Sequence, residues 1–399
     1  MTDRLPLTNA QLAFGLHAQR EGQKGTISLR FRAPASRLST DDLRQVLGSV
    51  VRQNSALSHR IRFSRGAAYQ EWCPTDCDFA ELRTESEDAV SRLLTDVVTE
   101  YEGDLDGAPM SARLIRSPES DHLVLVFDHA LVDEQSLLLI RRQLSAPSHP
   151  DGRERPRYEA AVNDRAAFER AAGVGPGVEF WTNRLGAVRG KFPDKKLTAP
   201  RAAPFVAFPS VAIPRAFRGS LFPYVLFSLH RAVRDVTIPE AIVIGYPWGA
   251  RSGAFSDVVG CFMNTVISLE TTSPQQPDAG MASFLDGWLQ EIDHADVPFT
   301  ALLGLGSEFS GAVTAYLSFT HATGGTVNVA GVDAVEVLPT HDSIPSTSAF
   351  EGAAAVHGDE LRLRLVVSEE AVDFGVQELG TRWRHWISEA ISGSPKQRS

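Results

Sequence analysis

The amino-acid sequence predicts an α/β protein built from two lobes. In both halves, short apolar stretches typical of buried strands alternate with longer stretches whose apolar residues recur at helical spacing. The chain of 399 residues is also long enough to form two domains. A stretch marked by proline and glycine near the middle of the chain separates these two halves, so we expect the lobes to span residues 1–177 and 178–399.

The elements of the first lobe follow from hydrophobic periodicity. Leu43, Val46 and Leu47 share one face of a predicted helix, and Thr40 precedes them as a residue type that caps helix N-termini. Residues 123–126 are all apolar, as in a strand that is buried on both faces. The predicted elements are a helix at 41–53, a strand at 57–63, a helix at 88–101, strands at 111–116 and 122–128, and a helix that ends near residue 144.

The second lobe repeats this mixture after a linker. Residues 145–156 contain prolines and a glycine without hydrophobic periodicity, which predicts a linker, and residues 173–177 are again rich in glycine. The predicted elements that follow are a helix at 221–233, strands at 241–246 and 262–269, a helix at 281–293, strands at 313–320 and 361–367, and a helix at 376–392.

Composition and charge exclude several classes of function. The net charge of -10, without a long basic run, argues against a nucleic acid or an anionic membrane as the partner. The sequence has neither an apolar signal core nor a stretch long enough to span a membrane. Cys73, Cys77 and Cys261 form no disulfide framework, which suits a reducing cytoplasm. Cys73 and Cys77 lack a second pair of ligands, so we expect no metal site.

A histidine at the end of a predicted strand is the main candidate for catalysis. His129 follows the strand at 122–128 directly and precedes a turn and a helix. Imidazole has an unperturbed pKa close to neutral, so His129 is suited to accept a proton from a nucleophile. A purely structural histidine is the alternative. The sequence contains no Walker A loop, no Gly-x-Gly-x-x-Gly and no Gly-x-Ser-x-Gly, so we expect neither a bound nucleotide cofactor nor a serine hydrolase of that type.

The segment around His129 carries a resemblance to a known family. Asp128, His129, Asp133 and Glu134 stand where the condensation domains of nonribosomal peptide synthetases have His-His-x-x-x-Asp-Gly. Those domains belong to the CoA-dependent acyltransferases with the chloramphenicol-acetyltransferase fold. Further motifs that resemble the family follow one another in the family's order along nearly the whole chain. They lie at residues 7–11, 106–114, 180–185, 245–251, 259–265 and 294–299.

The resemblance implies a fold and a set of site residues. Two chloramphenicol-acetyltransferase-like lobes would form a V with a central tunnel, and His129 would be the catalytic residue at its mouth. Asp133 would pair with Arg251 across the junction of the lobes in a supporting, structural role; a solvated helix N-cap is the alternative for Asp133. Ser318 and His321, on and just after the strand at 313–320, are further candidates for lining the tunnel from the second lobe.

Asp128 and Glu134 depart from the family's hallmark. The charge of Asp128 could raise the pKa of the neighbouring imidazole. We favour the alternative, in which Asp128 faces the opposite side of the strand from His129. Glu134 replaces a glycine at a tight turn, where a bulky acid could line and narrow the tunnel. We expect it to act as a first-turn acid of the helix, favourable against the helix dipole, rather than as a second base.

The resemblance also implies a function. It indicates a free-standing, cytoplasmic and monomeric condensation enzyme of antibiotic or other secondary-metabolite biosynthesis. Such an enzyme would transfer an acyl or aminoacyl group from a carrier-protein thioester to an amine, or to a hydroxyl. It would bind no cofactor, because phosphopantetheine would arrive on the substrate carrier or as coenzyme A.

Two alternatives stay open at this stage. Asp128 and Asp133 also fit the Asp-x-x-x-x-Asp signature of the related heterocyclization domains, so a heterocyclizing or dehydrating enzyme is the first alternative. The second alternative is a non-catalytic module that binds a carrier protein and recruits partners. It is motivated by Asp128 and Glu134, which replace the first His and the Gly of the family's motif.

Overall fold

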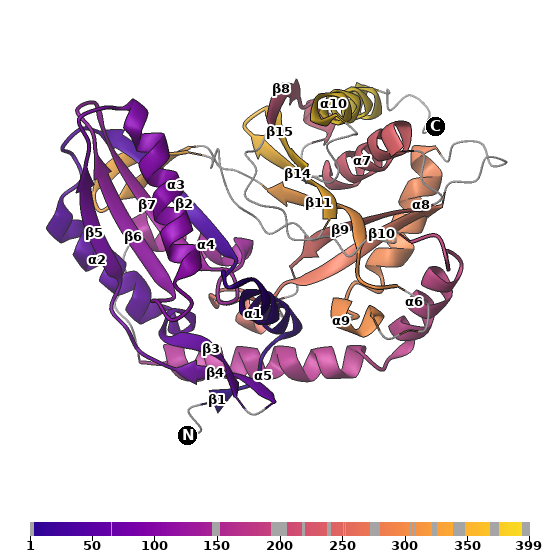
Figure 1. Ribbon diagram of the computed structural model, residues 1–399, viewed down its shortest axis with the longest axis horizontal. Coiled ribbons are helices and arrows are strands. Elements are labelled where there is room, and N and C mark those ends of the chain that lie inside the picture. The colour runs from indigo at the N-terminus through magenta and orange to yellow at the C-terminus, as the bar shows by residue number, and fades with distance from the viewer. Residues whose placement is uncertain are drawn as a thin grey trace. The chain divides into compact units, whose positions relative to one another are not determined.

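The computed structural model describes two compact units, each with a mixed β-sheet and helices (Figure 1), so the protein is of the predicted α/β class. Unit 1 consists of Met1–Ala171, Gly249–Met263 and Gly324–Ile344, and unit 2 of Ala172–Trp248, Asn264–Thr323 and Pro345–Ser399. The described residues are 4–64, 66–145, 152–192, 206–217, 220–237, 241–249, 251, 253–271, 280–303, 305, 309–320, 325–337, 348–367 and 375–392.

The main sheet of unit 1 has β7 near its centre. Its strands lie in the order β12 (Thr326–Val329), β13 (Val332–Glu336), β2 (Thr26–Pro34), β7 (Ser120–Asp128), β6 (Met110–Arg116) and β5 (Asp78–Arg83). Alternate residues of β7 point to opposite faces, and both faces are covered. Leu125 and Phe127 belong to one hydrophobic cluster, whereas Val124 and Val126 belong to another. This double burial explains the uninterrupted apolar run in the sequence.

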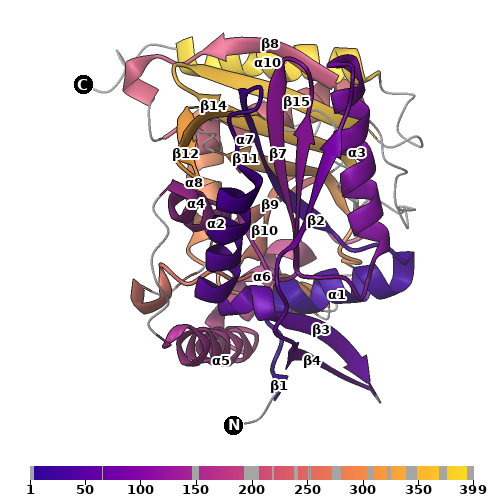
Figure 2. The ribbon, with the colours of Figure 1, turned by 90° about the vertical axis from the view of Figure 1, so that its left-hand side faces the viewer.

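Helices cover the two faces of this sheet. The larger hydrophobic cluster includes residues of α2 (Thr40–Gln53) and α4 (Glu134–Ser145), and the smaller one includes residues of α3 (Asp88–Gly103), which packs on β6 and β7 (Figure 2). Helix α1 (Asn9–Glu21) contacts β3. It begins with a capping box in which the side chains of Thr8 and Gln11 satisfy each other's backbone N–H groups.

A smaller sheet and a long helix complete unit 1. The sheet contains β1 (Arg4–Leu5), β4 (Ala67–Trp72) and β3 (His59–Ser64), which follows the 3-10 helix η1 (Ser55–Ser58). Helix α5 (Glu154–Ala172) is joined to this sheet by a buried chain of hydrogen bonds. The Tyr158 hydroxyl donates to Gln70 Oε1 at 2.6 Å, and Gln70 Nε2 donates to Gln11 Oε1 at 3.0 Å.

Unit 2 has its own mixed sheet. Its strands lie in the order β10 (Asn264–Thr271), β9 (Ala241–Trp248), β11 (Val313–Thr320), β14 (Ser348–His357), β15 (Glu360–Val367) and β8 (Val206–Ala212). Strand β9 alternates between two clusters, with Ile242 and Ile244 in one and Val243 in the other. Both faces of this strand are therefore buried as well.

The helices of unit 2 also contribute residues to these two clusters. One cluster contains residues of α7 (Phe222–Thr237), α8 (Met281–Ile292) and α10 (Val376–Ser392), and Figure 1 shows α7 and α10 side by side. The other contains residues of α6 (Pro176–Gly186) and α9 (Phe299–Leu302). The short 3-10 helices are η2 (Arg215–Phe217) in unit 2 and η3 (Gly253–Phe255) in unit 1. Within the described ranges, no helix combines the length and the apolar character needed to cross a membrane.

The sequence suggested two lobes that meet between residues 177 and 178. The two units of the structure divide the chain differently. Two segments of the second half, 249–263 and 324–344, pack in unit 1. The second of them contains β13, which pairs with β2 through Val335 opposite Arg32. Local sequence patterns do not predict this arrangement, because the hydrogen bonds of a sheet can join strands that are far apart in the chain.

Most predicted elements are present, with shifts at their ends. Strands β6 and β7 and helix α10 lie where the periodicity placed them. The stretch predicted as a strand at 57–63 begins inside η1 and continues as β3. The predicted linker at 145–156 falls partly outside the described residues, and its last described residues already belong to α5, which begins at Glu154.

Candidate active site

The turn that carries His129 leaves the end of β7 and is held by its backbone. The Asp128 N–H donates to the Pro109 carbonyl oxygen, and the His129 N–H donates to that of Gly25, both at 3.0 Å. Pro109 and Gly25 immediately precede the two strands that flank β7. The Val132 N–H donates to the Asp128 carbonyl oxygen at 3.1 Å and closes the turn.

The imidazole of His129 is held in one tautomer. Its Nδ1 lies 3.0 Å from the Val132 carbonyl oxygen, which can only accept a hydrogen bond, so Nδ1 carries the proton. The lone pair of the neutral ring is then on Nε2. The ring stacks on Phe14 of α1 with centroids 4.4 Å apart. Within the described part of the chain, Nε2 makes no hydrogen bond, which leaves this atom for a substrate.

Burial lowers the pKa of His129 below its ordinary value of 6.5, because the surrounding protein replaces the water that would solvate an imidazolium. The hydrogen bond to Val132 and the charges of Asp133 and Asp128 act in the opposite direction, but burial is the largest effect. His129 is therefore neutral at neutral pH. This is the protonation state that a general base requires.

Asp133 is buried and has a structural role. Its Oδ1 accepts a hydrogen bond from the Ser136 N–H at 2.9 Å, which caps the N-terminus of α4. Its Oδ2 accepts from the Phe262 N–H at 3.1 Å. Asp133 therefore caps a helix, which was the alternative to the ion pair in the sequence analysis. The cap is not solvated, however, because the residue is only 3% exposed. The carboxylate joins α4 to the segment 249–263.

Arg251 completes this connection. Its Nη2 donates to Asp133 Oδ1 at 2.6 Å, and the two side chains are only 3% and 4% exposed. Its Nε donates to the Val258 carbonyl oxygen and its Nη1 to Gln135 Oε1. The ion pair expected from the resemblance is present. It lies inside unit 1, however, and not across a junction of two lobes, because the segment that carries Arg251 packs in unit 1.

Ser136 is a member of this cluster that the sequence analysis missed. Its buried hydroxyl accepts hydrogen bonds from Arg251 Nη2 at 2.7 Å and from the Gly260 N–H at 3.0 Å. The hydroxyl proton lies within reach of both Asp133 Oδ1 and the Gly260 carbonyl oxygen, each at 2.9 Å. Its position three residues after Asp133, in the first turn of a helix, is the only local signal for it.

Asp128 continues the face of β7 that carries Val124 and Val126, which is the face covered by α3. Its Oδ1 accepts a hydrogen bond from the Ala130 N–H at 2.9 Å. Burial raises the pKa of Asp128, while the charge of Lys24 acts against this. Asp128 faces a pocket with Lys24, as the alternation of strand residues predicts, although its charge still acts against the lowering of the His129 pKa by burial.

The remaining candidates are placed as follows. Glu134 is the exposed first residue of α4, the position of a first-turn acid. Ser318 belongs to unit 2, in which it lies half-buried on β11 opposite Ala353 of β14. His321 lies outside the described residues. The structure therefore brings His129, Asp128, Asp133 and Arg251 together in unit 1.

Comparison with protein-family models and with curated proteins finds no match. Several solved structures are similar. The first condensation domain of the CDA synthetase has a TM-score of 0.75 and 16% identity, over 98% of this chain and 96% of that chain. The starter condensation domain of the rhizomide synthetase RzmA, a mutant in complex with C8-CoA and Leu-SNAC, has a TM-score of 0.71 and 15% identity, over 98% and 94%.

A third similar structure is the X-domain from teicoplanin biosynthesis in complex with OxyB, with a TM-score of 0.76 and 16% identity, over 98% and 94%. All three similarities extend over nearly the whole of both chains, and the hallmark turn of unit 1 is built as described above. The protein therefore has the fold of the condensation domains of nonribosomal peptide synthetases.

Proposed function

We propose that the protein transfers an acyl or aminoacyl group from a phosphopantetheine thioester to an amine, with His129 as the group that accepts the amine's proton. The observation that carries this proposal is the hydrogen bond between His129 Nδ1 and the Val132 carbonyl oxygen, because it leaves the basic lone pair on Nε2. The similarity to condensation domains, one of them solved with C8-CoA and Leu-SNAC, supports the choice of reaction.

The chemistry follows from this geometry. The amine nitrogen attacks the thioester carbonyl carbon, so that a C–N bond forms and the C–S bond breaks. Nε2 of His129 takes the proton that the nitrogen must lose and returns it to the departing thiolate sulfur. General base catalysis of this kind contributes typically ~10²–10⁴-fold, and positioning of the two reactants adds to it. Asp133 and Arg251 take no proton in this scheme and hold the turn in place.

The test is single-turnover transfer from an acyl-loaded carrier protein to a weakly basic amine, whose own protonation does not change above pH 5. We expect His129→Ala to reduce the rate by ~10²–10⁴-fold. Because the pKa of His129 is lowered, the wild-type rate should fall only when the pH drops below 6.5, and the residual rate of His129→Ala should lack this acid limb. Arg157→Ala serves as the control, since it removes an exposed ion pair with Asp257.

Two results would contradict the proposal. A His129→Ala rate within about threefold of wild type is far below the range for a general base and would indicate pure positioning. A wild type that binds the loaded carrier but acylates none of a panel of amines and alcohols would favour a recruitment module. The X-domain structure supports that second candidate, because a chain of similar fold was solved in complex with the protein OxyB.

The mass of the product distinguishes the heterocyclization alternative. A simple amide retains all atoms of both substrates except the carrier thiol, whereas a heterocycle has lost one further water. Asp133 is already engaged by Arg251, Ser136 and Phe262, which favours a structural use of this carboxylate.

A further inference from the structure

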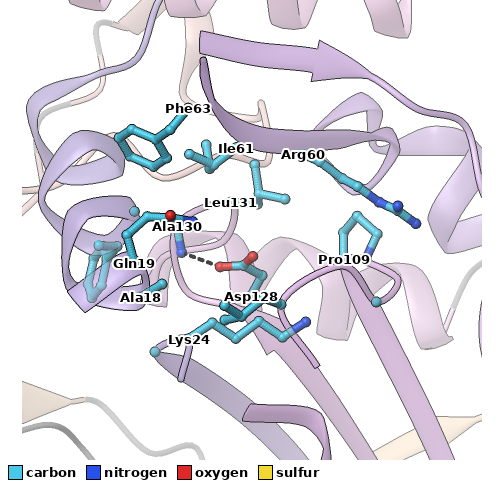
Figure 3. Close-up of a pocket in the computed structure, with 15 residues that line it drawn as sticks. Ala18, Gln19, Lys24, Arg60, Ile61, Phe63, Pro109, Asp128, Ala130 and Leu131 are labelled. Atoms are coloured by element: carbon cyan, nitrogen blue, oxygen red, sulfur yellow. Dashed lines mark hydrogen bonds between the residues drawn. The ribbon is translucent and has the colours of Figure 1, made fainter. Parts of the chain in front are cut away.

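A second polar site lies in unit 1 next to Phe14, the residue whose ring stacks on His129. It is a pocket of about 50 Å³ between α1, β3 and the turn after β7 (Figure 3). Phe14, Ile61 and Leu131 give it apolar walls, and Lys24, Arg60 and Asp128 give it charges. The pocket is far smaller than the roughly 300–1,000 Å³ of sites for whole small molecules, so it has room only for a single small group.

Lys24 is the most buried of the three charged residues, with 5% of the residue exposed. Its Nζ lies 3.8 Å from the centroid of the Tyr101 ring, a contact that stabilises a cation. In the described part of the chain this nitrogen donates no hydrogen bond and forms no ion pair. Burial lowers the pKa of Lys24 below its ordinary value, and the charges of Asp128, Asp104 and Asp106 act against this. A buried ammonium thus has unused donors next to the pocket.

Arg60 adds a second cation with unused donors. It is half-buried on β3, and its Nε is buried without a hydrogen-bond partner among the described residues. The neighbouring Arg62 on the same strand differs in this respect, because it forms ion pairs with Glu71 and Asp106. Because Arg60 lines the pocket, an anionic group that enters it meets a guanidinium that has no ion pair among the described residues.

Asp128 sets the charge of the ligand. Only its Oδ1 has a hydrogen bond in the described part of the structure, from the Ala130 N–H (Figure 3). Asp128 opposes the charges of Lys24 and Arg60, and the charges of Asp104 and Asp106 also act on Lys24. A singly charged carboxylate is repelled less by these acids than a phosphate dianion, so the pocket suits a carboxylate better.

We propose that Lys24 and Arg60 bind a carboxylate group of the acceptor, so that the preferred acceptor is a free amine that also carries a carboxylate. This inference rests on the proposed acyl transfer. It is supported by the position of the pocket, because Phe14, which lines it, stacks directly on the His129 ring. An acceptor held by its carboxylate in the pocket is thereby kept close to the imidazole.

The first experiment compares β-alanine with propylamine as acceptors in the transfer assay. Hydrogen bonds to a charged group contribute enough to favour β-alanine by roughly tenfold to a hundredfold in KM. Arg60→Gln and Lys24→Met should each bring the ratio of the two KM values towards one. Arg62→Gln is the matched control, because it removes the same charge from the same strand but from a residue that already has partners. It should preserve the preference.

The second experiment does not depend on transfer. Acetate and inorganic phosphate are titrated into the full chain carrying His129→Ala and followed by NMR, with and without Arg60→Gln or Arg62→Gln. We expect acetate to bind, and its affinity to fall by about tenfold or more with Arg60→Gln alone. If acetate binds in this way but the wild type transfers nothing, the pocket is confirmed as a carboxylate site and the proposed reaction is wrong.

Three results would overturn the inference while leaving the reaction intact. The first is transfer without any preference for β-alanine. The second is an equal loss of that preference in Arg60→Gln and Arg62→Gln, which would reduce the effect to the overall charge. The third is tighter binding of phosphate than of acetate in the pocket, which would replace the carboxylate by a phosphate group as the ligand.

Discussion

His129 and Asp133 lie four residues apart, yet their surroundings fit them for different tasks. The His129 ring makes one hydrogen bond through Nδ1 and has its other nitrogen free of hydrogen bonds in the described part of the chain. Both carboxylate oxygens of Asp133 are hydrogen-bonded, and the residue is 3% exposed. Removing the imidazole therefore takes away a reactive group, whereas removing the carboxylate leaves Arg251 charged and buried.

At the residue scale we predict a large loss of stability for Asp133→Ala. Breaking a buried ion pair typically costs about 3–5 kcal/mol, because the partner is left without compensation. Arg157→Ala is the control, because its ion pair with Asp257 also joins the segment 249–263 to the rest of unit 1 but is about half exposed. An exposed pair contributes less than about 1 kcal/mol.

Denaturant unfolding of the two variants and of His129→Ala checks this prediction. His129→Ala should unfold close to the wild type, since it deletes no buried ion pair. If His129→Ala proves less stable than Asp133→Ala, the structural and chemical roles have been assigned to the wrong residues.

Among the elements of unit 2, helix α8 is anchored through a buried acid. Glu291, at 1% exposure, accepts hydrogen bonds from the Leu269 N–H of β10 at 3.1 Å and from Arg184 Nη2 of α6 at 2.8 Å, both at its Oε1. Burial raises its pKa from 4.5 to about 7, although Arg184 and the hydrogen bonds oppose the shift. The carboxylate joins three elements, but keeping it charged in the core is costly.

This pKa predicts a pH dependence of stability. The folded state holds the proton of Glu291 up to about pH 7, whereas the unfolded chain releases it near 4.5, so this group's contribution to stability falls as the pH rises through that window. Each unit of pKa difference corresponds to about 1.4 kcal/mol. Because Glu291→Gln cannot ionise, its stability relative to the wild type should improve between pH 5 and pH 8.

The measurement is denaturant unfolding of both proteins at the two pH values, with Glu179→Gln on the exposed side of α6 as the control. The control substitution should change the free energy of unfolding by the same amount at both pH values. The prediction fails if the difference between Glu291→Gln and the wild type is the same at pH 5 and pH 8.

On the scale of the whole molecule, the chain order and the order in space differ. Unit 1 contains segments 249–263 and 324–344, which lie far from its other residues in sequence. Val258, Val259 and Phe262 from the first segment belong to its main hydrophobic cluster, and β13 from the second pairs with β2. The first unit is therefore complete only after most of the chain is present.

We predict that a fragment of residues 1–177 does not fold cooperatively. It would leave Asp133 buried without Arg251 and would leave β2 without its neighbour β13. Thermal unfolding followed by circular dichroism should show a broad change for the fragment and a sharp transition for the full chain. A sharp transition together with a well-dispersed NMR spectrum for the fragment would show that the two segments are dispensable.

Much of the secondary structure could be predicted from the sequence, and the exceptions have physical reasons. Strand β7 contains a continuous apolar run at residues 123–127, and α10 has a clear amphipathic period, so local pattern was sufficient for both. Helix α5 was missed because part of its buried face is charged: Arg165 and Glu169 form an ion pair at 2.8 Å with side chains only 5% and 3% exposed. A pattern based on apolar residues cannot detect such a face.

The sequence by itself determined the α/β class and the strand-end position of His129, because hydrophobic periodicity and residue type are local properties. It also predicted, through resemblance, that Asp133 pairs with Arg251. Only the tertiary structure decided that this pair lies within one unit, that Val132 fixes the imidazole tautomer, and that Lys24 and Arg60 share a pocket with Asp128. These features depend on contacts between residues that are distant in the chain or on the direction of single groups, and no local pattern encodes them.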